Sequence, residues 1–333
     1  MAAGAYILGC SGPVLSKGEA AFFREADPWG FILFGRNIVD PTQLAALTAS
    51  LRETVGRDAP ILIDQEGGRV QRLVPPHWIQ WQPPLDQMDQ AGPLSAARSM
   101  FLRYRVIADE LRRVGIDANC APMADIAMPQ THEFLKNRCY GADVVTVVGA
   151  ARAVANGLLA GGVLPVLKHL PGHGRAVADS HFELPRVTAS RETLWDTDFA
   201  PFKALIDLPM AMTAHIVFSA FDEAPATTSE LMMSLIRTDM GYDGLVMTDD
   251  ISMQALDGSI ASRCTASMQA GCDVILHCNG DMDEMLDVAQ ATGTLGADAA
   301  RRAQAALDQR HAPDGIDIEA AIAEFDALMN VNA

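Results

Sequence analysis

Short apolar segments recur along the chain, and most of them are apolar at nearly every position instead of alternating with polar residues. Strands that are covered on both faces of a parallel sheet have this pattern. The pattern therefore predicts a buried parallel sheet. The predicted strands are residues 5–10, 30–35, 61–65, 116–126, 163–170, 210–218, 244–250 and 273–278.

The stretches between these segments have the apolar spacing of amphipathic helices. The clearest one follows the second predicted strand, where Asp40 is a good N-cap, Pro41 suits the first helical position and Gly56 suits the end. Four apolar residues of this stretch fall on one helical face: Leu44, Leu47, Leu51 and Val55. Further helices are predicted at residues 94–114, 143–160, 190–206, 228–238, 258–270 and 281–293, with a closing helix at residues 316–329.

About eight strands alternating with helices place the chain in the α/β class and favour a (β/α)8 barrel of the TIM type, with a doubly wound open sheet as the alternative. No linker rich in serine and glycine divides the chain, so we expect one catalytic domain over residues 1–333. In such barrels the active site lies at the carboxyl ends of the strands. Chemistry is therefore expected at the ends of the predicted strands 61–65, 163–170, 210–218 and 244–250.

Composition narrows the possible partners. Of the 333 residues, 49% are hydrophobic and 20% are charged, and the formal charge of −17 disfavours nucleic acid as a partner. No apolar run approaches the roughly 20 residues that a membrane-spanning helix needs. The first residues lack a basic start followed by an apolar stretch, so they are interpreted as a strand and not as a signal peptide. We expect a cytoplasmic monomer that acts on a small-molecule substrate.

A metal or cofactor site is not predicted. His169 and His173 have a spacing that could hold zinc on a helix, but Pro171 and Gly172 between them break any helix there. The glycine pairs of the chain do not match phosphate-binding loops and are interpreted as tight turns. None of the six cysteines forms a CxxC pair.

Two groups of titratable residues instead point to acid–base chemistry. Asp179 and His181 are two positions apart, so in extended backbone the carboxylate can hold one nitrogen of the imidazole and leave the other for the substrate. Asp249 and Asp250 end a predicted strand and should point to opposite faces, with Asp249 suited to chemistry and Asp250 to a supporting hydrogen bond. A carboxylate nucleophile and a proton donor are the two groups that a retaining glycoside hydrolase needs, and Asp64 adds a third carboxylate near them.

Two other functions compete with this interpretation. A barrel lyase or aldolase could use Lys168 to form a Schiff base with a carbonyl substrate. A sugar-binding protein without catalytic activity could use the same polar residues. Cleavage of a chromogenic glycoside would exclude the sugar-binding protein, and borohydride trapping with substrate would reveal the Schiff base.

Three motifs, LIDQEGGRVQRL, KHLPGHG followed by DSHFELP, and GLVMTDDISM, together resemble family 3 glycoside hydrolases. More closely, they are similar to the short single-domain bacterial β-N-acetylglucosaminidases of cell-wall recycling. The resemblance implies a cytoplasmic enzyme that removes terminal N-acetylglucosamine from muropeptides carrying anhydro-N-acetylmuramic acid. It implies Asp249 as nucleophile, and His181 paired with Asp179 as acid/base. The implied sugar-binding residues are Asp64, Arg72, Arg138, Lys168 and His169, although Cys139 and Tyr140 after Arg138 depart from the usual serine and phenylalanine.

Overall fold

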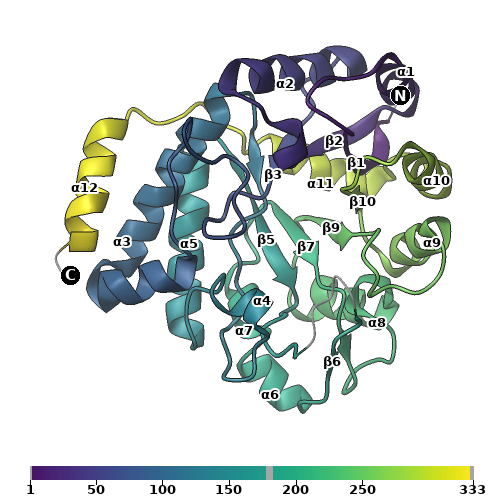
Figure 1. Ribbon diagram of the computed structural model, residues 1–333. Coiled ribbons are helices and arrows are strands. Elements are labelled where there is room, and N and C mark those ends of the chain that lie inside the picture. Colours follow the sequence, from purple (N-terminus) through teal and green to yellow (C-terminus); the bar gives the residue numbers. More distant parts are fainter. Residues whose placement is uncertain (1, 178–182, 331–333) are drawn as a thin grey trace.

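A computed structural model describes residues 2–177 and 183–330 of the chain. Its centre is a closed barrel of eight parallel strands in the order β1-β10-β9-β7-β5-β4-β3-β2 (Figure 1). The barrel strands are β1 (Gly4–Gly9), β2 (Pro28–Leu33), β3 (Ile61–Ile63), β4 (Ala118–Asn119), β5 (Leu164–Leu170), β7 (Met210–Thr213), β9 (Leu245–Asp250) and β10 (Val274–His277). The barrel prediction is confirmed, and the open sheet is wrong because β1 pairs with both β2 and β10 and closes the sheet.

Two strands are shorter in the structure than the sequence predicts. The segment 116–126 forms a strand only at Ala118–Asn119, with one further isolated bridge between Met123 and Lys168, and Pro122, which cannot donate to a ladder, lies between them. The segment 210–218 leaves the barrel after Thr213. Its last residues form β8 (Val217–Phe218), which pairs in parallel with β6 (Arg186–Val187) outside the barrel.

Side-chain alternation along the strands decides which residues face the barrel interior. One apolar cluster takes every second residue of several strands, such as Leu164 and Val166 of β5, and Leu245 and Met247 of β9. The neighbouring residues of the same strands pack in a second cluster with the surrounding helices. Continuing the interior register towards the carboxyl ends leads to Lys168 on β5 and Asp249 on β9. Both therefore project into the mouth of the barrel.

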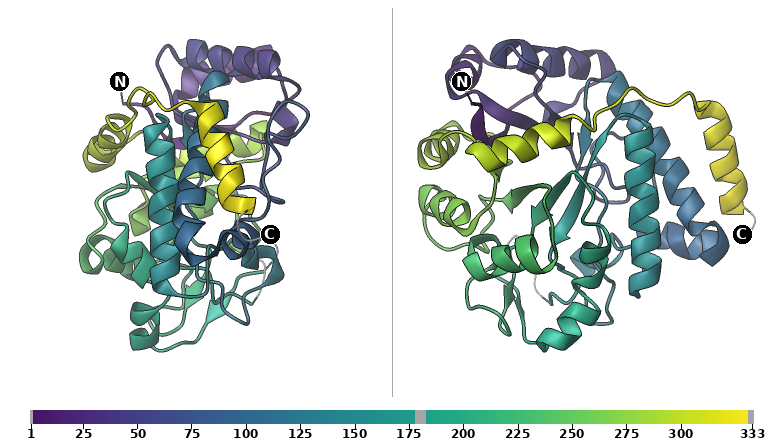
Figure 2. Two further views of the ribbon diagram at one scale, coloured as in Figure 1. Left: turned by 90° about the vertical axis from the view of Figure 1, so that its left-hand side faces the viewer. Right: turned by 180° about the vertical axis from the view of Figure 1, so that it is seen from behind.

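Helices surround the barrel on the outside (Figure 2). They are α1 (Lys17–Ala26), α2 (Pro41–Val55), α3 (Pro84–Arg113), α4 (Glu133–Lys136), α5 (Val144–Ala160), α6 (Arg191–Asp196), α7 (Ala200–Ala204), α8 (Glu230–Ser234), α9 (Ile260–Ala270), α10 (Met282–Thr292), α11 (Ala297–Leu307) and α12 (Ile318–Asn330). Each helix that the sequence predicted is present. The predicted helix 190–206 is divided into α6 and α7, and α1, α4 and α11 were not predicted.

The last helix, α12, packs against α3 on the outside of the barrel (Figures 1 and 2). Arg98 of α3 forms a bidentate ion pair with Glu324 of α12, with N–O distances of 2.7 Å. The amide of Gln90 also donates to the carbonyl oxygen of Met329, at 3.0 Å. The chain's final helix is thereby joined to the helix that follows β3.

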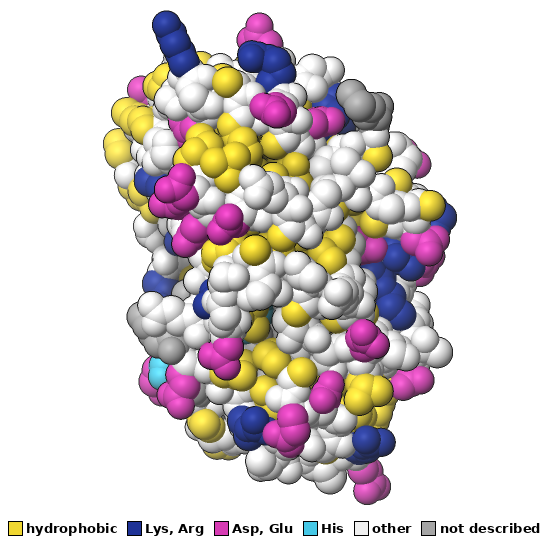
Figure 3. All heavy atoms as spheres, turned by 90° about the vertical axis from the view of Figure 1, so that its right-hand side faces the viewer, with side chains coloured by type: hydrophobic (Ala, Val, Ile, Leu, Met, Phe, Trp, Pro, Cys, Tyr) yellow, Lys and Arg dark blue, Asp and Glu magenta, His cyan; other side chains and the backbone are white. Residues whose placement is uncertain are grey.

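The surface over α9 and α10 carries acidic, basic and hydrophobic side chains mixed together, without a broad basic region (Figure 3). Among the described residues, no helix is both long and apolar enough to cross a membrane.

Candidate active site

A polar cavity of about 130 Å³ opens at the carboxyl ends of the barrel strands. We call it the site cavity. It is lined by Ile32, Phe34, Asp64, Val70, Arg72, Phe134, Leu135, Arg138, Lys168, His169, His173, Met212, Asp249, Asp250, Met253, Leu276 and Cys278. Every predicted site residue that the structure describes is in this lining. The predicted acid/base pair, Asp179 and His181, lies outside the described residues.

Asp249 is held as a carboxylate in this cavity. It sits near the end of β9, and its Oδ1 accepts a hydrogen bond of 2.8 Å from the backbone N–H of Asp250. Burial favours the neutral acid, but the nearby imidazoles of His169 and His215, together with this hydrogen bond, outweigh burial and lower the pKa of Asp249. An ionised carboxylate at this position can act as a nucleophile or can stabilise a positive charge that develops on a substrate.

The neighbouring carboxylate has a different role. The Oδ1 and Oδ2 atoms of Asp250 accept hydrogen bonds from the backbone N–H and the hydroxyl of Ser252, at 3.1 and 2.8 Å. Its Oδ1 also accepts from the backbone N–H of Cys278, at 3.2 Å. Asp250 thus joins the loops after β9 and β10. From the described residues, Asp249 accepts fewer hydrogen bonds than Asp250 does.

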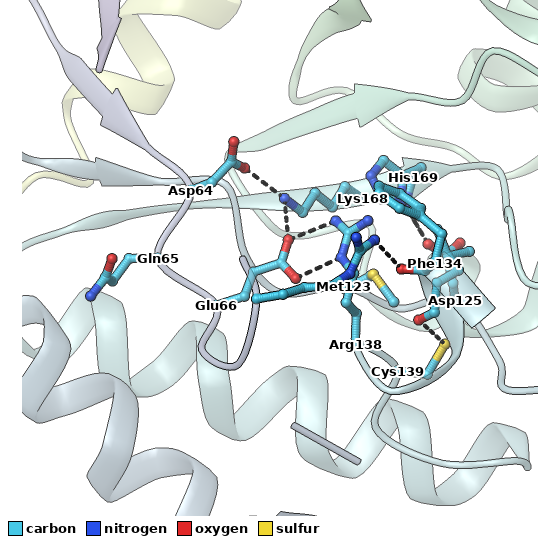
Figure 4. Close-up of polar contacts among 12 residues, drawn as sticks. Asp64, Gln65, Glu66, Met123, Asp125, Phe134, Arg138, Cys139, Lys168 and His169 are labelled. Carbon is cyan, nitrogen blue, oxygen red and sulfur yellow. Dashed lines mark hydrogen bonds and ion pairs between the residues drawn. The ribbon is translucent and has the colours of Figure 1, made fainter. Parts of the chain in front are cut away.

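A network of buried charges forms the wall opposite these loops (Figure 4). The ammonium of Lys168 donates to Oδ1 of Asp64 at 2.9 Å and lies 2.6 Å from Oε1 of Glu66. Glu66 also accepts two hydrogen bonds from Arg138, at 2.9 and 2.8 Å. Arg72 completes the set with a contact of 3.3 Å to Oδ2 of Asp64. Two carboxylates and three cations therefore position one another.

The turn after β3 brings Glu66 into this network. Gly67 and Gly68 have φ angles of 111° and 59°, which residues other than glycine rarely adopt. A Cβ on Gly67 would also collide with the guanidinium of Arg103, which is buried beneath the turn and donates to the carbonyl oxygen of Glu66. The prediction of a tight turn at these glycines is confirmed.

The charge state of Lys168 argues against Schiff-base chemistry. Burial favours the neutral amine, but Asp64 and Glu66 outweigh burial and raise the pKa of Lys168. A Schiff-base lysine must be a neutral nucleophile and usually has a lowered pKa. Lys168 is instead a fixed cation, suited to donating hydrogen bonds to a ligand.

We expect the Glu66→Gln substitution to lower the free energy of unfolding by about 3 kcal/mol at neutral pH, because Lys168 and Arg138 lose a buried anionic partner. Burial opposes ionisation of Glu66, but Arg138 and Lys168 hold its pKa at about 2. A carboxylate with a lowered folded-state pKa contributes stability above the unfolded pKa of about 4.3, and this contribution is lost as pH falls towards the folded pKa. The difference between wild type and variant should therefore shrink from about pH 4.5 downwards.

Urea unfolding of both proteins at neutral and acidic pH measures this difference. Glu324→Gln is the matched control, since it removes a half-exposed ion pair with Arg98 and should change stability by less than about 1 kcal/mol. If Glu66→Gln has the same cost at every pH, the charge of Glu66 is not what stabilises the network.

One further carboxylate, that of Asp125, contacts both histidines of the site cavity. Asp125 is buried, and its Oδ2 lies 2.7 Å from Nδ1 of His169. Its Oδ1 accepts a hydrogen bond of 2.6 Å from the backbone N–H of His173. Burial favours the neutral acid, but the contacts with His169 outweigh it and lower the pKa of Asp125. An ionised Asp125 accepts from Nδ1–H of His169, so Nε2 is the nitrogen of His169 that can meet a ligand.

Sequence reasoning missed Glu66 and Asp125. Glu66 lies in the same strand-end motif as Asp64, so its position after β3 was a usable signal. Asp125 was assigned to a predicted strand, which hid its role. His215 does not line the site cavity, and both of its ring nitrogens have partners, Thr227 Oγ1 at 2.8 Å and the carbonyl oxygen of Asp250 at 3.1 Å.

Comparisons with known proteins agree with this architecture. The sequence profile of the glycosyl hydrolase family 3 N terminal domain matches residues 22–309. A protein from Bordetella pertussis named beta-hexosaminidase is 35% identical over 293 residues, which cover 85% of this chain and 83% of that protein. Another protein of that name, from Methylococcus capsulatus, is 36% identical over 273 residues, 80% of each chain.

Solved structures give the same result. Native NagZ from Neisseria gonorrhoeae superposes with a TM-score of 0.85 at 29% identity, covering 100% of this chain and 97% of that one. A family 3 β-N-acetylglucosaminidase from Paenibacillus superposes with a TM-score of 0.86 at 27% identity, covering 98% of this chain and 67% of that one. The chain therefore belongs to glycosyl hydrolase family 3 and is a glycoside hydrolase.

Proposed function

We propose that this protein is a retaining exo-β-N-acetylglucosaminidase with Asp249 as its nucleophile. One observation carries the proposal. Asp249 is an ionised carboxylate in a polar cavity whose opposite wall carries fixed hydrogen-bond donors, Lys168 among them. A sugar bound to those donors would present its anomeric carbon to a carboxylate, as the first step of retaining hydrolysis requires.

The names of related proteins support the choice of sugar. The curated relatives are named beta-hexosaminidase, and a solved neighbour from Paenibacillus is named β-N-acetylglucosaminidase. The Neisseria gonorrhoeae neighbour was also solved with N-trifluoroacetyl-D-glucosamine, an analogue of N-acetylglucosamine. These names favour an amino sugar over plain glucose as the substrate.

The proposed reaction has two displacements. In the first, a carboxylate oxygen of Asp249 bonds to the anomeric carbon, the glycosidic C–O bond breaks, and the departing oxygen takes a proton from His181. In the second, water gives a proton to His181 and attacks the anomeric carbon, which releases Asp249. The role of Asp179 is to orient the imidazole and support its protonated form.

The network residues are proposed to bind the terminal sugar. Asp64 can accept hydrogen bonds from hydroxyl groups, and Arg72, Lys168 and His169 can donate to hydroxyl or acetamido oxygens. Arg138 uses Nε and Nη2 to hold Glu66, so its Nη1 is the nitrogen that a sugar could reach. Glu66 and Asp125 act as positioning residues, because they hold the donors without being required to touch the sugar.

The physiological substrate is proposed to be an N-acetylglucosaminyl-anhydro-N-acetylmuramyl peptide from cell-wall recycling, cleaved by a cytoplasmic monomer. The motifs around Asp64, Lys168 and Asp249, read in order along the chain, support this. Hydrolysis of 4-nitrophenyl N-acetyl-β-glucosaminide, compared with the corresponding glucoside, tests the sugar. Activity on neither glycoside would refute the proposed function. Assays with and without phosphate show whether phosphate can replace water as acceptor.

Activity should survive treatment with a chelator such as EDTA. The proposed chemistry uses a carboxylate and an imidazole and requires no Lewis acid. Among the described residues, no group of three or more histidines, cysteines or acidic residues could hold a metal ion. The measurement is the rate on the aryl glycoside before and after dialysis against chelator. Loss of activity that zinc restores would assign the histidines of the cavity to a metal site.

A further inference from the structure

His173 is an unusual residue of the site cavity. It lies in the turn after β5, and its side chain is only 2% exposed. Both ring nitrogens are buried, and neither has a hydrogen-bond partner within residues 2–177 and 183–330. Buried side-chain nitrogens nearly always have a partner, so an exception in a cavity wall points to a missing ligand or water.

The position of this ring does not depend on its nitrogens. The backbone N–H of His173 donates to Asp125 at 2.6 Å, and its carbonyl oxygen accepts from the backbone N–H of Ala176 at 3.0 Å. The ring itself packs edge-to-face against His169, with centroids 5.7 Å apart and an interplanar angle of 66°. The backbone and this stacking therefore place the ring, and neither nitrogen is needed to hold it.

The ring is neutral at physiological pH. Burial and the neighbouring His169 lower the pKa of His173 to about 4, although Asp125 and Asp249 act in the opposite direction. A neutral imidazole has one N–H donor and one nitrogen acceptor. It is therefore poorly suited to donate a catalytic proton and well suited to a neutral polar group.

A sugar hydroxyl suits such a ring, because it can donate to the unprotonated nitrogen or accept from the N–H, whichever of the two nitrogens meets the ligand. We propose that His173 is a specificity-determining residue whose neutral imidazole binds one ring hydroxyl of the terminal sugar in the site cavity. This inference rests on the proposed function and adds a sugar contact to it.

The test compares aryl N-acetyl-β-glucosaminides that lack the 3-, 4- or 6-hydroxyl with the parent glycoside. His173→Phe keeps a ring against His169 and removes both nitrogens. On the parent glycoside this variant should lose about tenfold in kcat/KM. For the wild type, kcat/KM should fall by a similar factor when the contacted hydroxyl is removed from the substrate. For the variant, kcat/KM on that analogue should be only slightly lower than on the parent glycoside. His173→Asn has a donor and an acceptor and should restore part of the discrimination.

His311→Leu is the control, because it removes an exposed imidazole from the loop before α12 and should change neither rate nor discrimination. If His173→Phe does not fold, His173→Leu provides the same comparison. A His173 variant that discriminates against all three deoxy analogues as strongly as the wild type does would overturn the inference, even if its overall rate is lower. A wild-type protein that does not cleave the parent glycoside overturns the proposed function, and this inference with it.

Discussion

Replacing Asp249 by asparagine should reduce hydrolysis by about 10⁴-fold or more, because an amide cannot form the glycosyl–enzyme bond. Substrate binding should persist, since the donors on the opposite wall do not depend on Asp249 for their positions. The rate on an aryl N-acetyl-β-glucosaminide and the dissociation constant of a GlcNAc-type ligand measure the two effects. A variant that keeps more than about one tenth of the wild-type rate would show that Asp249 is not the nucleophile.

Asp308→Asn is a suitable control for this experiment. Asp308 follows α11, on the outside of the barrel, and accepts a hydrogen bond from Gln304. The same substitution there changes one charge without touching the site cavity, so the rate should stay within about twofold of wild type.

The stereochemistry of the product provides a second check on Asp249. Two inversions at the anomeric carbon give net retention. Proton NMR of the first-formed sugar should therefore show the β anomer before mutarotation. If the α anomer forms first, water attacks directly and Asp249 is not a covalent nucleophile.

The barrel strands could be predicted because burial on both faces leaves a continuous apolar segment, as in Leu164–Leu167 of β5. Their ends could not be predicted with the same accuracy. In the apolar segment 116–126, the pairing with β3 ends at Asn119, whose side chain accepts from the backbone N–H of Gln65 and donates to its carbonyl oxygen. A side chain that competes with the sheet in this way has no signature in apolar periodicity.

Two of the missed helices, α1 and α11, were missed for different reasons. Helix α1 begins with a capping box, in which Ser16 and Glu19 bond each other's backbone N–H groups, and this signal was present in the sequence. Helix α11 begins after Gly296 without a side-chain cap, and small alanine side chains predominate in it. Its apolar positions therefore carry little hydrophobicity, although alanine itself favours helix.

The sequence could place Asp64, Lys168 and Asp249 in one cavity because parallel strands bring their carboxyl ends together. The partners that hold them in place follow from tertiary structure. Glu66 meets Arg138 across 72 residues of sequence, and Asp125 meets His169 across 44. A buried carboxylate is predictable only once its cations are known to be near, because an unpaired charge would not be buried there.

After Asp249→Asn, the second large loss of rate is expected from replacing the proposed acid/base, His181. His181 must donate a proton as the glycosidic bond breaks and take one from water as the intermediate is hydrolysed. A nitrophenolate leaves without a proton, whereas a sugar alkoxide does not. The His181→Ala substitution should therefore reduce the rate on a disaccharide or muropeptide by about 10²–10⁴-fold, and the rate of glycosylation by an aryl glycoside much less.

With the aryl glycoside, hydrolysis of the intermediate should become rate-limiting in His181→Ala, and azide should accelerate turnover because it attacks the anomeric carbon without needing a base. Asp179→Ala should show the same pattern in milder form, since the imidazole remains while its orientation and basicity are lost. Steady-state rates on both substrate classes, with and without azide, measure these effects. If His181→Ala slows both classes equally and azide has no effect, the proton donor is a different residue.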